Sequence, residues 1–343
     1  MREVEQKEIR GDGKLRIIPV EADCLAEATH EAIIACHDKG FRVETPKQKK
    51  GMTLGYDADI DIIVKNPDSE PKVYFPGMHD DGRGEMQYIL EVTHGIHNHW
   101  KKNKEHPEWW GYTYNERFAD QLPFVLARIK HDWQEKGRIT GRDYNFGIWR
   151  ASEDVILEQE DSPCFQRGQF RFIENSEGEI VMNYITDWRS RDLLKAWNSN
   201  NIGQIELMKL FRAKVSQMLE TPIKLGAYVD HSSSLHLYGL YIDRDNLEQQ
   251  IMQMKKDGYK AKSTTLEDCF GMPNGKTAEQ LKRLIYAQSI AEQMGHGLNQ
   301  PEETLANMGI DVNKFPYPAE WDTWPKSWDS VPEEGVLSGV ALR

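Results

Sequence analysis

The chain is poor in the features that mark several classes of protein. Only four of its 343 residues are cysteine, and they form neither a close pair nor a C-x-x-C motif. A disulfide framework and a cysteine-rich metal site are therefore not expected. No apolar run is long enough to cross a bilayer. The formal net charge of −12 argues against binding to a nucleic-acid backbone, which usually requires a basic face.

The N-terminal residues are charged and lack the apolar core of a signal peptide. Together with the unpaired cysteines, this predicts a cytoplasmic protein with reduced thiols and without a membrane partner. A small anionic substrate is compatible with the acidic composition, because a few basic residues suffice to make a local pocket.

The chain is 39% hydrophobic, which is enough to bury a sizeable core. Strand-like and helix-like segments alternate along it. This pattern predicts an α/β (α+β) fold with a mixed, mainly antiparallel sheet and surrounding helices. We expect a single domain over residues 1–343, with residues 1–72 as a candidate N-terminal elaboration.

Hydrophobic periodicity and turn residues locate the elements. Strands are predicted at 15–20, at 59–64, in three pieces between 144 and 186, and at 225–242. Helices are predicted at 24–39, 85–101, 117–134, 192–220 with a break near Asn198, 248–256 and 277–294. Residues 175–178 read as a hairpin turn. The end of the chain from Phe315, which carries three tryptophans among prolines, reads as irregular packed coil.

Three motifs carry the chemistry. The first is S-P-C-F-Q-R-G-Q-F at 162–170, the second is D-W-R-S-R-D at 187–192, and the third is H-L-Y at 236–238. A lone cysteine is usually a small buried hydrophobe. A reactive thiolate requires neighbouring cations that lower its pKa. Arg167 and Arg189 are candidates for that role beside Cys164.

The second motif suits a phosphate group, and the third offers two polar side chains that can reach one ligand group. The guanidinium of Arg189 and the hydroxyl of Ser190 match a phosphate, although such a tetrapeptide alone is more often a surface charge run. Asn200, eight residues after Asp192, offers a donor and an acceptor side by side. Asn198 and Asn201 lie close by in the sequence, so which of the three asparagines occupies this position is left open. His236 and Tyr238 point to one face if they lie in a strand.

These motifs resemble the core of the thymidylate synthase and pyrimidine nucleotide hydroxymethylase family, with a pattern closer to archaeal-type members. The resemblance implies that Cys164 is the nucleophile. It also implies that Arg189 and Ser190 bind the 5′-phosphate and that Asn200 reads the base. The remaining substrate and cofactor contacts implied by the resemblance are Gln169 in the cysteine motif, His236 and Tyr238 at the ribose, and Asp192 at the folate.

Other segments resemble the family more loosely. Tyr114 matches the tyrosine that assists proton removal, and either Glu85 or Glu91 is the expected proton-shuttling glutamate, with a slight preference for Glu85. Trp109 and Trp110 are candidates for a cofactor wall, although paired tryptophans are more often packing residues. Arg142 is expected to cross a homodimer interface. Three positions depart from the family pattern, namely Phe165 for histidine, Asp143 for arginine and Ser234 for aspartate.

The resemblance implies one-carbon transfer from 5,10-methylenetetrahydrofolate to C5 of a pyrimidine deoxynucleoside monophosphate, without a metal and without a nucleic-acid partner. Asn200 favours conversion of dUMP to dTMP, the thymidylate synthase reaction. The alternatives are a dUMP or dCMP 5-hydroxymethylase that makes a modified DNA precursor, and an inactive member that binds nucleotide or RNA as a regulator.

Overall fold

The structure is a computed structural model that describes residues 13–44, 53–78, 81–100, 111–155, 162–295 and 301–330. Trp109 and Trp110, the predicted cofactor wall, lie outside the described residues. Among the helices that are described, none combines the length and the apolar character needed to cross a membrane.

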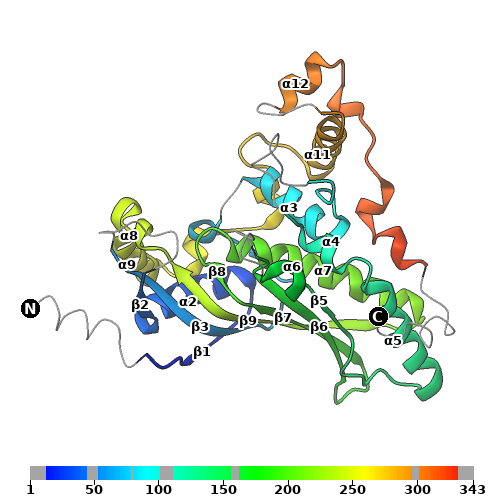
Figure 1. The fold of residues 1–343 in the computed structure, drawn as a ribbon, viewed down its shortest axis with the longest axis horizontal. Coiled ribbons are helices and arrows are strands. Elements are labelled where there is room, and N and C mark those ends of the chain that lie inside the picture. Colours follow the sequence, from blue (N-terminus) through cyan, green and yellow to red (C-terminus); the bar gives the residue numbers. More distant parts are fainter. Residues whose placement is uncertain are drawn as a thin grey trace, which may run out of the picture.

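One large sheet organises the described chain (Figure 1). Its strands are β1 (Ile17–Ala22), β2 (Phe41–Val43), β3 (Gly55–Val64), β5 (Asn145–Gly147), β6 (Phe165–Glu174), β7 (Ile180–Trp188), β8 (Arg191–Asp192) and β9 (Ile223–Leu237). The main path runs β1-β3-β9-β7-β6-β5, while β2 pairs with β3 and β8 pairs with β9. Two pairs along this path are parallel (β1–β3 and β9–β7) and the other three are antiparallel, so the predicted mixed α/β fold is confirmed.

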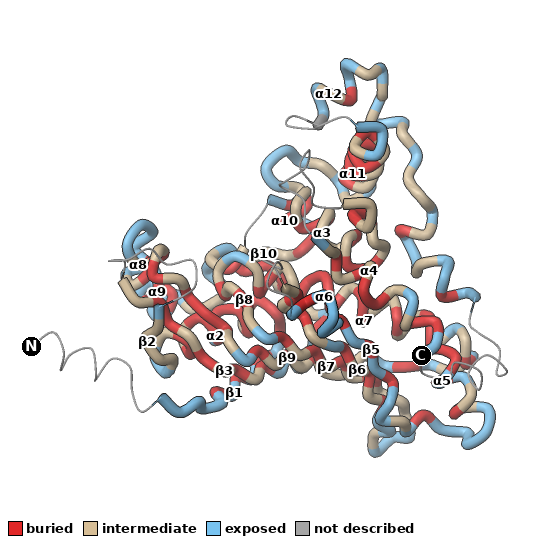
Figure 2. The backbone as a smooth tube through the Cα atoms, viewed as in Figure 1, coloured by how far each residue is buried: buried red, intermediate tan, exposed pale blue. Residues whose placement is uncertain are grey.

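Some helices cover one face of this sheet, and others pack on those helices. They are α2 (Leu25–Lys39), α3 (Gly82–His94), α4 (Tyr114–Phe118), α5 (Leu122–Lys136), α6 (Ala151–Asp154), α7 (Trp197–Met218), α8 (Gly239–Asp245), α9 (Leu247–Asp257), α10 (Leu266–Phe270), α11 (Ala278–Gln293) and α12 (Pro301–Asn307). In Figure 1, α3, α4 and α7 lie above the sheet, and α11 and α12 project beyond α3. Figure 2 shows buried residues concentrated where helices meet strands.

Aromatic side chains fill the space between α7 and the sheet. Phe170 of β6 stacks on Phe211 of α7 with ring centroids 3.8 Å apart. Trp328 then meets Phe211 edge-on at 5.7 Å. Trp328 is fully buried in the 3₁₀ turn η5 (Lys326–Trp328), and Trp321 is buried in η4 (Ala319–Asp322). The tryptophan-rich segment is therefore packed coil, as predicted.

The remaining short elements are η1 (Phe75–Gly77), η2 (Tyr259–Lys262), η3 (Val312–Lys314), and the two-stranded sheet of β4 (Val73–Tyr74) and β10 (Ser263–Thr264). Among the described residues before 73, β1, β2 and β3 belong to the main sheet, and β3 lies between β1 and β9.

Four element predictions were wrong in extent. The helix predicted at 85–101 ends at His94, and the one predicted at 117–134 is divided between α4 and α5. The helix that begins at Trp197 is not broken near Asn198, because the polar side chains there find partners on other elements. The strand predicted at 225–242 ends at Leu237, and residues 239–245 form α8. The predicted helices at 24–39, 248–256 and 277–294 are confirmed within one or two residues.

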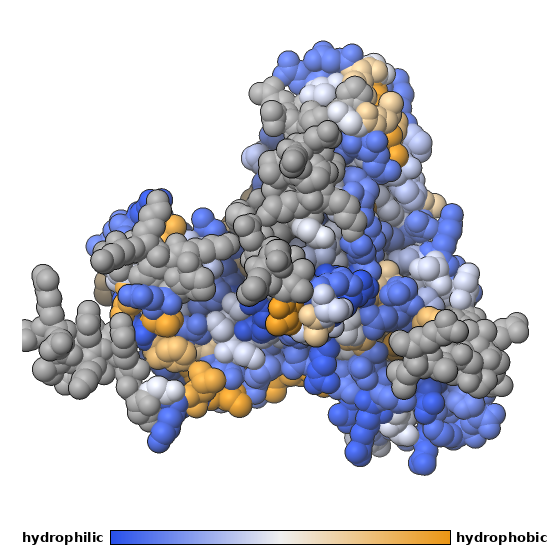
Figure 3. All heavy atoms as spheres, viewed as in Figure 1, coloured by the Kyte–Doolittle hydropathy of each residue, from blue (hydrophilic) through white to orange (hydrophobic). Residues whose placement is uncertain are grey.

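The sheet face opposite the helices is partly exposed and carries a row of charges. In register across four strands lie Asp61 (β3), His231 (β9), Asp187 (β7) and Arg167 (β6). Their signs alternate when His231 is protonated, and Arg167 Nε contacts Asp187 Oδ2 at 2.5 Å. Ile17 of β1 is 58% exposed and Ile63 of β3 is 37% exposed. Figure 3 shows apolar surface at the lower left of the molecule.

Candidate active site

The cysteine motif and the arginine motif meet in the structure. Cys164 directly precedes β6 and is partly buried against the core. Arg189 donates from Nε to the carbonyl of Pro163 at 2.9 Å and from Nη2 to the carbonyl of Ser162 at 2.7 Å. Its backbone N–H donates to the Cys164 carbonyl at 2.9 Å. Arg189 therefore fixes the backbone that presents the thiol, and none of the four cysteines forms a disulfide.

Two tyrosines lie near Cys164. Tyr114 begins α4, and its ring meets Phe165 edge-on at 5.7 Å and Trp188 at 5.6 Å. Burial raises the pKa of Tyr114, and the charge of Cys164 contributes in the same direction. Burial also raises the pKa of Tyr238, with contributions from the charges of Asp192 and Cys164. Both phenols therefore stay protonated at neutral pH and are available as hydrogen-bond donors.

The ribose-type pair also comes together. The rings of His236 and Tyr238 meet edge-on with centroids 4.6 Å apart. The backbone N–H of Leu193 donates to the carbonyl of His236 at 2.9 Å, so β8 is held beside the end of β9. This bond connects the arginine motif to the H-x-Y motif.

Asp192 stabilises the turn that leads into α7. Its Oδ1 accepts from the backbone N–H groups of Leu194 at 3.0 Å and Lys195 at 3.1 Å, and its Oδ2 accepts from the hydroxyl of Tyr241. Both oxygens thus have partners within the protein. A carboxylate has about four acceptor positions, so further hydrogen bonds from a ligand remain compatible with this arrangement.

The polar run at the start of α7 is bonded residue by residue to other elements. Asn198 Nδ2 donates to the carbonyl of Lys72 at 3.0 Å, and Ser199 Oγ donates to Glu85 Oε1 at 2.5 Å. Asn200 Nδ2 donates to the hydroxyl of Tyr88 at 2.7 Å. The side chain of Asn200 therefore has a fixed neighbour on α3.

The two candidate glutamates have different surroundings on α3. Glu85 is buried beside α7, where Ser199 donates to it. Glu91 Oε2 lies 2.7 Å from His97 Nδ1. Both acids flank Tyr88, whose pKa is raised by burial and by the charge of Glu91. Sequence reasoning missed Tyr88, although its position three residues from each glutamate places it on the same side of the helix.

Gln169 and Arg142 lie together at the β5 edge of the sheet. Gln169 Nε2 donates to the backbone carbonyl of Arg142 at 2.6 Å, and Gln169 pairs with Asn145 across the strands. Arg142 is exposed. Side chains alternate along β6, so Gln169, which lies between the buried Gly168 and Phe170, projects away from the helices. Ser190 is half-buried between Arg189 and Arg191.

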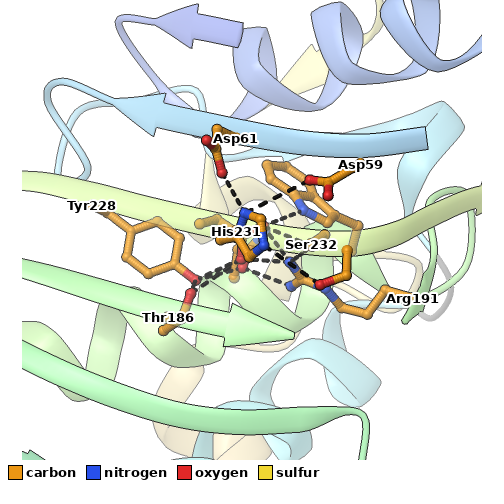
Figure 4. Close-up of polar contacts among 11 residues, drawn as sticks. Asp59, Asp61, Thr186, Arg191, Tyr228, His231 and Ser232 are labelled. Carbon is orange, nitrogen blue, oxygen red and sulfur yellow. Dashed lines mark hydrogen bonds and ion pairs between the residues drawn. The ribbon is translucent and has the colours of Figure 1, made fainter. Parts of the chain in front are cut away.

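Beneath this group lies a buried ion pair that sequence reasoning also missed. Arg191 pairs with Asp230, and their side chains are 1% and 0% exposed. Arg191 also donates to Ser232 Oγ at 2.7 Å and to Asn201 Oδ1 at 3.0 Å. Its guanidinium lies 4.0 Å from the ring centroid of Trp188. Figure 4 shows Arg191 beside Ser232, with Tyr228 and Thr186 close by.

Comparison of the chain with known proteins finds only a distant structural similarity. No protein-family model matches the chain, and none of the curated proteins does. Among solved structures the chain is similar to the thermostable thymidylate synthase A from Bacillus subtilis, at 14% sequence identity and a TM-score of 0.42. The similarity covers 65% of this chain and 82% of that chain. A likeness this distant carries no argument about activity or substrate.

The buried pair gives a stability prediction. Asp230→Asn keeps the shape but leaves Arg191 buried without a counter-ion, so the free energy of unfolding should fall by about 3–5 kcal/mol. Arg167→Met removes the partner of Asp187 in a partly exposed pair and should cost at most about 1 kcal/mol. Urea unfolding of both variants measures the difference. Equal losses in the two variants would contradict a structural role for the buried pair.

Proposed function

We propose that the protein transfers a one-carbon unit from 5,10-methylenetetrahydrofolate to C5 of a pyrimidine deoxynucleoside 5′-monophosphate, with Cys164 as the nucleophile. The preferred reaction is the methylation of dUMP to dTMP. The observation that carries the proposal is the direct contact between two motifs 25 residues apart: Arg189 binds the backbone on both sides of the thiol-bearing residue.

The surroundings of Cys164 suit covalent catalysis. The guanidinium of Arg189 lies beside the cysteine loop, and a nearby cation stabilises a thiolate. In the proposed reaction the sulfur bonds to C6 of the ring, and C5 becomes carbanion-like and attacks the methylene carbon of the folate. A base then removes the proton from C5 while the remaining bond between the transferred carbon and the folate nitrogen breaks, which leaves an exocyclic methylene on the ring. The bond between sulfur and C6 breaks when hydride or water adds to that methylene, and the thiolate is regenerated. Tyr114 and either Glu85 or Glu91 are proposed to handle that proton.

The nucleotide contacts follow from the same group of side chains. Arg189 and Ser190 are proposed to bind the phosphate, and His236 and Tyr238 the ribose hydroxyl. Asn200 is proposed to pair with the base. Its Nδ2 already donates to Tyr88 at 2.7 Å, which turns the amide oxygen toward other partners. An acceptor in that place suits N3–H of uracil.

A second candidate function is 5-hydroxymethylation of dUMP or dCMP. Both reactions share the chemistry up to the exocyclic methylene. The synthase then transfers hydride from the folate and releases dihydrofolate, whereas the hydroxymethylase adds water and releases tetrahydrofolate. An inactive regulator that binds nucleotide or RNA is the third candidate, and it requires no reactive thiol at Cys164.

We further propose a homodimer formed through the partly exposed sheet face, with Arg142 reaching the partner's phosphate. The row of charges across the four strands supports a second copy of the chain as the partner that covers this face. When two such rows meet around a two-fold axis, the Arg167 end of one lies opposite the Asp61 end of the other. The exposed residues Ile17 and Ile63 would gain an apolar partner.

The dimer gives a prediction on mass. Analytical ultracentrifugation at micromolar concentration should yield twice the chain mass of 39.7 kDa. Ile63→Lys places a charge on the proposed interface and should produce monomers. Met252→Lys changes an equally apolar exposed residue on α9 and should leave the dimer intact. A monomeric native protein would rule the interface out.

Trapping tests the nucleophile. With 5-fluoro-dUMP and methylenetetrahydrofolate, the native protein should form a covalent adduct on Cys164, because the fluorine blocks removal of the C5 substituent. Cys164→Ala should form none, while Cys24→Ala should form it normally, because Cys24 is a buried thiol in front of α2. Intact-protein mass spectrometry gives the readout. An undiminished adduct in Cys164→Ala would contradict the proposed mechanism. The absence of an adduct in the native protein would favour the third candidate function, an inactive regulator.

Arg189 is expected to act on both binding and chemistry. Arg189→Lys keeps the charge but loses the planar fork that binds phosphate and the Ser162 and Pro163 carbonyls. We predict that KM for the nucleotide rises and kcat falls, each by about tenfold or more. Arg167→Lys is the matched control on the opposite sheet face. Steady-state kinetics that leave both constants unchanged in Arg189→Lys would remove Arg189 from the site.

Base preference and product identity test the choice of reaction. The native enzyme should favour dUMP over dCMP in kcat/KM, and its product should have the mass of dTMP. Tyr88→Phe removes the acceptor that orients Asn200 and should reduce this preference by about tenfold. Asn200→Asp should shift it toward dCMP. A native preference for dCMP, or a product heavier by one oxygen, would identify a hydroxymethylase instead.

A further inference from the structure

A second group of polar side chains lies on the partly exposed sheet face. Asp59 and Asp61 are two residues apart on β3, so both project to one side. His231 of β9 pairs directly with Asp61. One carboxylate oxygen from each aspartate and one imidazole nitrogen lie within 4.8 Å of one another. Figure 4 shows the three side chains converging over β3 and β9.

The hydrogen bonds of this group leave one carboxylate poorly satisfied. His231 Nδ1 contacts Asp61 Oδ1 directly but lies 3.8 Å from Asp59 Oδ1. That oxygen of Asp59 is buried and accepts no hydrogen bond from any described residue. The Asp59 side chain is only 13% exposed. A proton on His231 therefore serves Asp61 and leaves Asp59 without a donor.

The electrostatic surroundings favour a cation. Asp187 of β7 lies next to His231 in the row, although its carboxylate already pairs with Arg167.

A metal ion at the centre of the triad can satisfy all three groups together, which a single proton cannot. Bond lengths of about 2.0–2.2 Å from carboxylate oxygen and imidazole nitrogen are typical of zinc. Ligation replaces the proton held between His231 and Asp61 and draws Asp59 inward. Imidazole beside carboxylate favours transition metals over Ca²⁺ and Mg²⁺, which prefer oxygen ligands.

We infer that Asp59, Asp61 and His231 bind one divalent transition-metal ion of the zinc or manganese class. The site is separate from the candidate active site. Side chains alternate along β9, so His231 projects away from the helices, while its neighbours Asp230 and Ser232 project toward Arg191. The inference therefore does not depend on the proposed reaction.

Metal titration of the full chain tests this site. The protein is first treated with chelator and dialysed, and Zn²⁺ is then added in a calorimeter. We expect saturable binding of one ion per chain. Asp61→Asn and His231→Gln should each weaken the affinity by at least about tenfold. Because thiolates also bind Zn²⁺, the titration is repeated with Mn²⁺, which prefers oxygen and nitrogen ligands.

His37→Gln is the matched control. His37 also lies between two carboxylates, Asp38 and Glu248, but these contact opposite ring nitrogens and do not converge. This variant should bind like the native protein. Zn²⁺ should also raise the Tm of the native and His37→Gln proteins but not that of His231→Gln, which is checked for native folding by circular dichroism. Absence of saturable binding, or equal affinity in native and His231→Gln proteins, would overturn the inference.

Discussion

The position of every candidate active-site residue around β8 depends on the buried pair of Arg191 and Asp230. A buried charge is tolerated only beside its counter-ion, so this pair fixes β8 against β9 and the start of α7. Arg189 and Asp192 flank Arg191 by one or two residues. Arg189 contacts the cysteine loop, and Asp192 contacts the turn that leads into α7. Both orientations follow from the fixed position of Arg191 between them. The chemistry proposed at Cys164 thus rests on an interaction outside the proposed substrate contacts.

Local chemistry explains which parts of this architecture could be predicted from sequence. Thr277 and Gln280 form a capping box that starts α11 where the pattern placed a helix, and Gly40 directly follows α2 as predicted. The hairpin turn of residues 175–178 is likewise local. The motifs around Cys164 and Arg189 could be linked by resemblance, and their contact in the structure is direct. These signals lie within a few residues of the feature they specify.

The features that escaped prediction depend on partners distant in sequence. The polar start of α7 looked like a helix break, but Asn198 bonds to Lys72 and Asn200 to Tyr88, each more than 110 positions away. Arg191 looked like part of a surface charge run because its counter-ion, Asp230, is 39 positions away. A polar side chain costs free energy in a core only when unpaired, and a single sequence does not reveal the pairing.

The strand order also has a consequence for how the protein is made. β3 pairs with β1, which emerges before it, but its other neighbour is β9, and Asp61 and His231 are 170 positions apart. At about 5–20 residues per second, a ribosome needs about 10–30 s to reach the partner strand. During that interval the edge of β3 that pairs with β9 lacks its native partner, and such edges pair readily with other chains. Chaperone binding to the nascent N-terminal third would protect the strand that later sits beside β9.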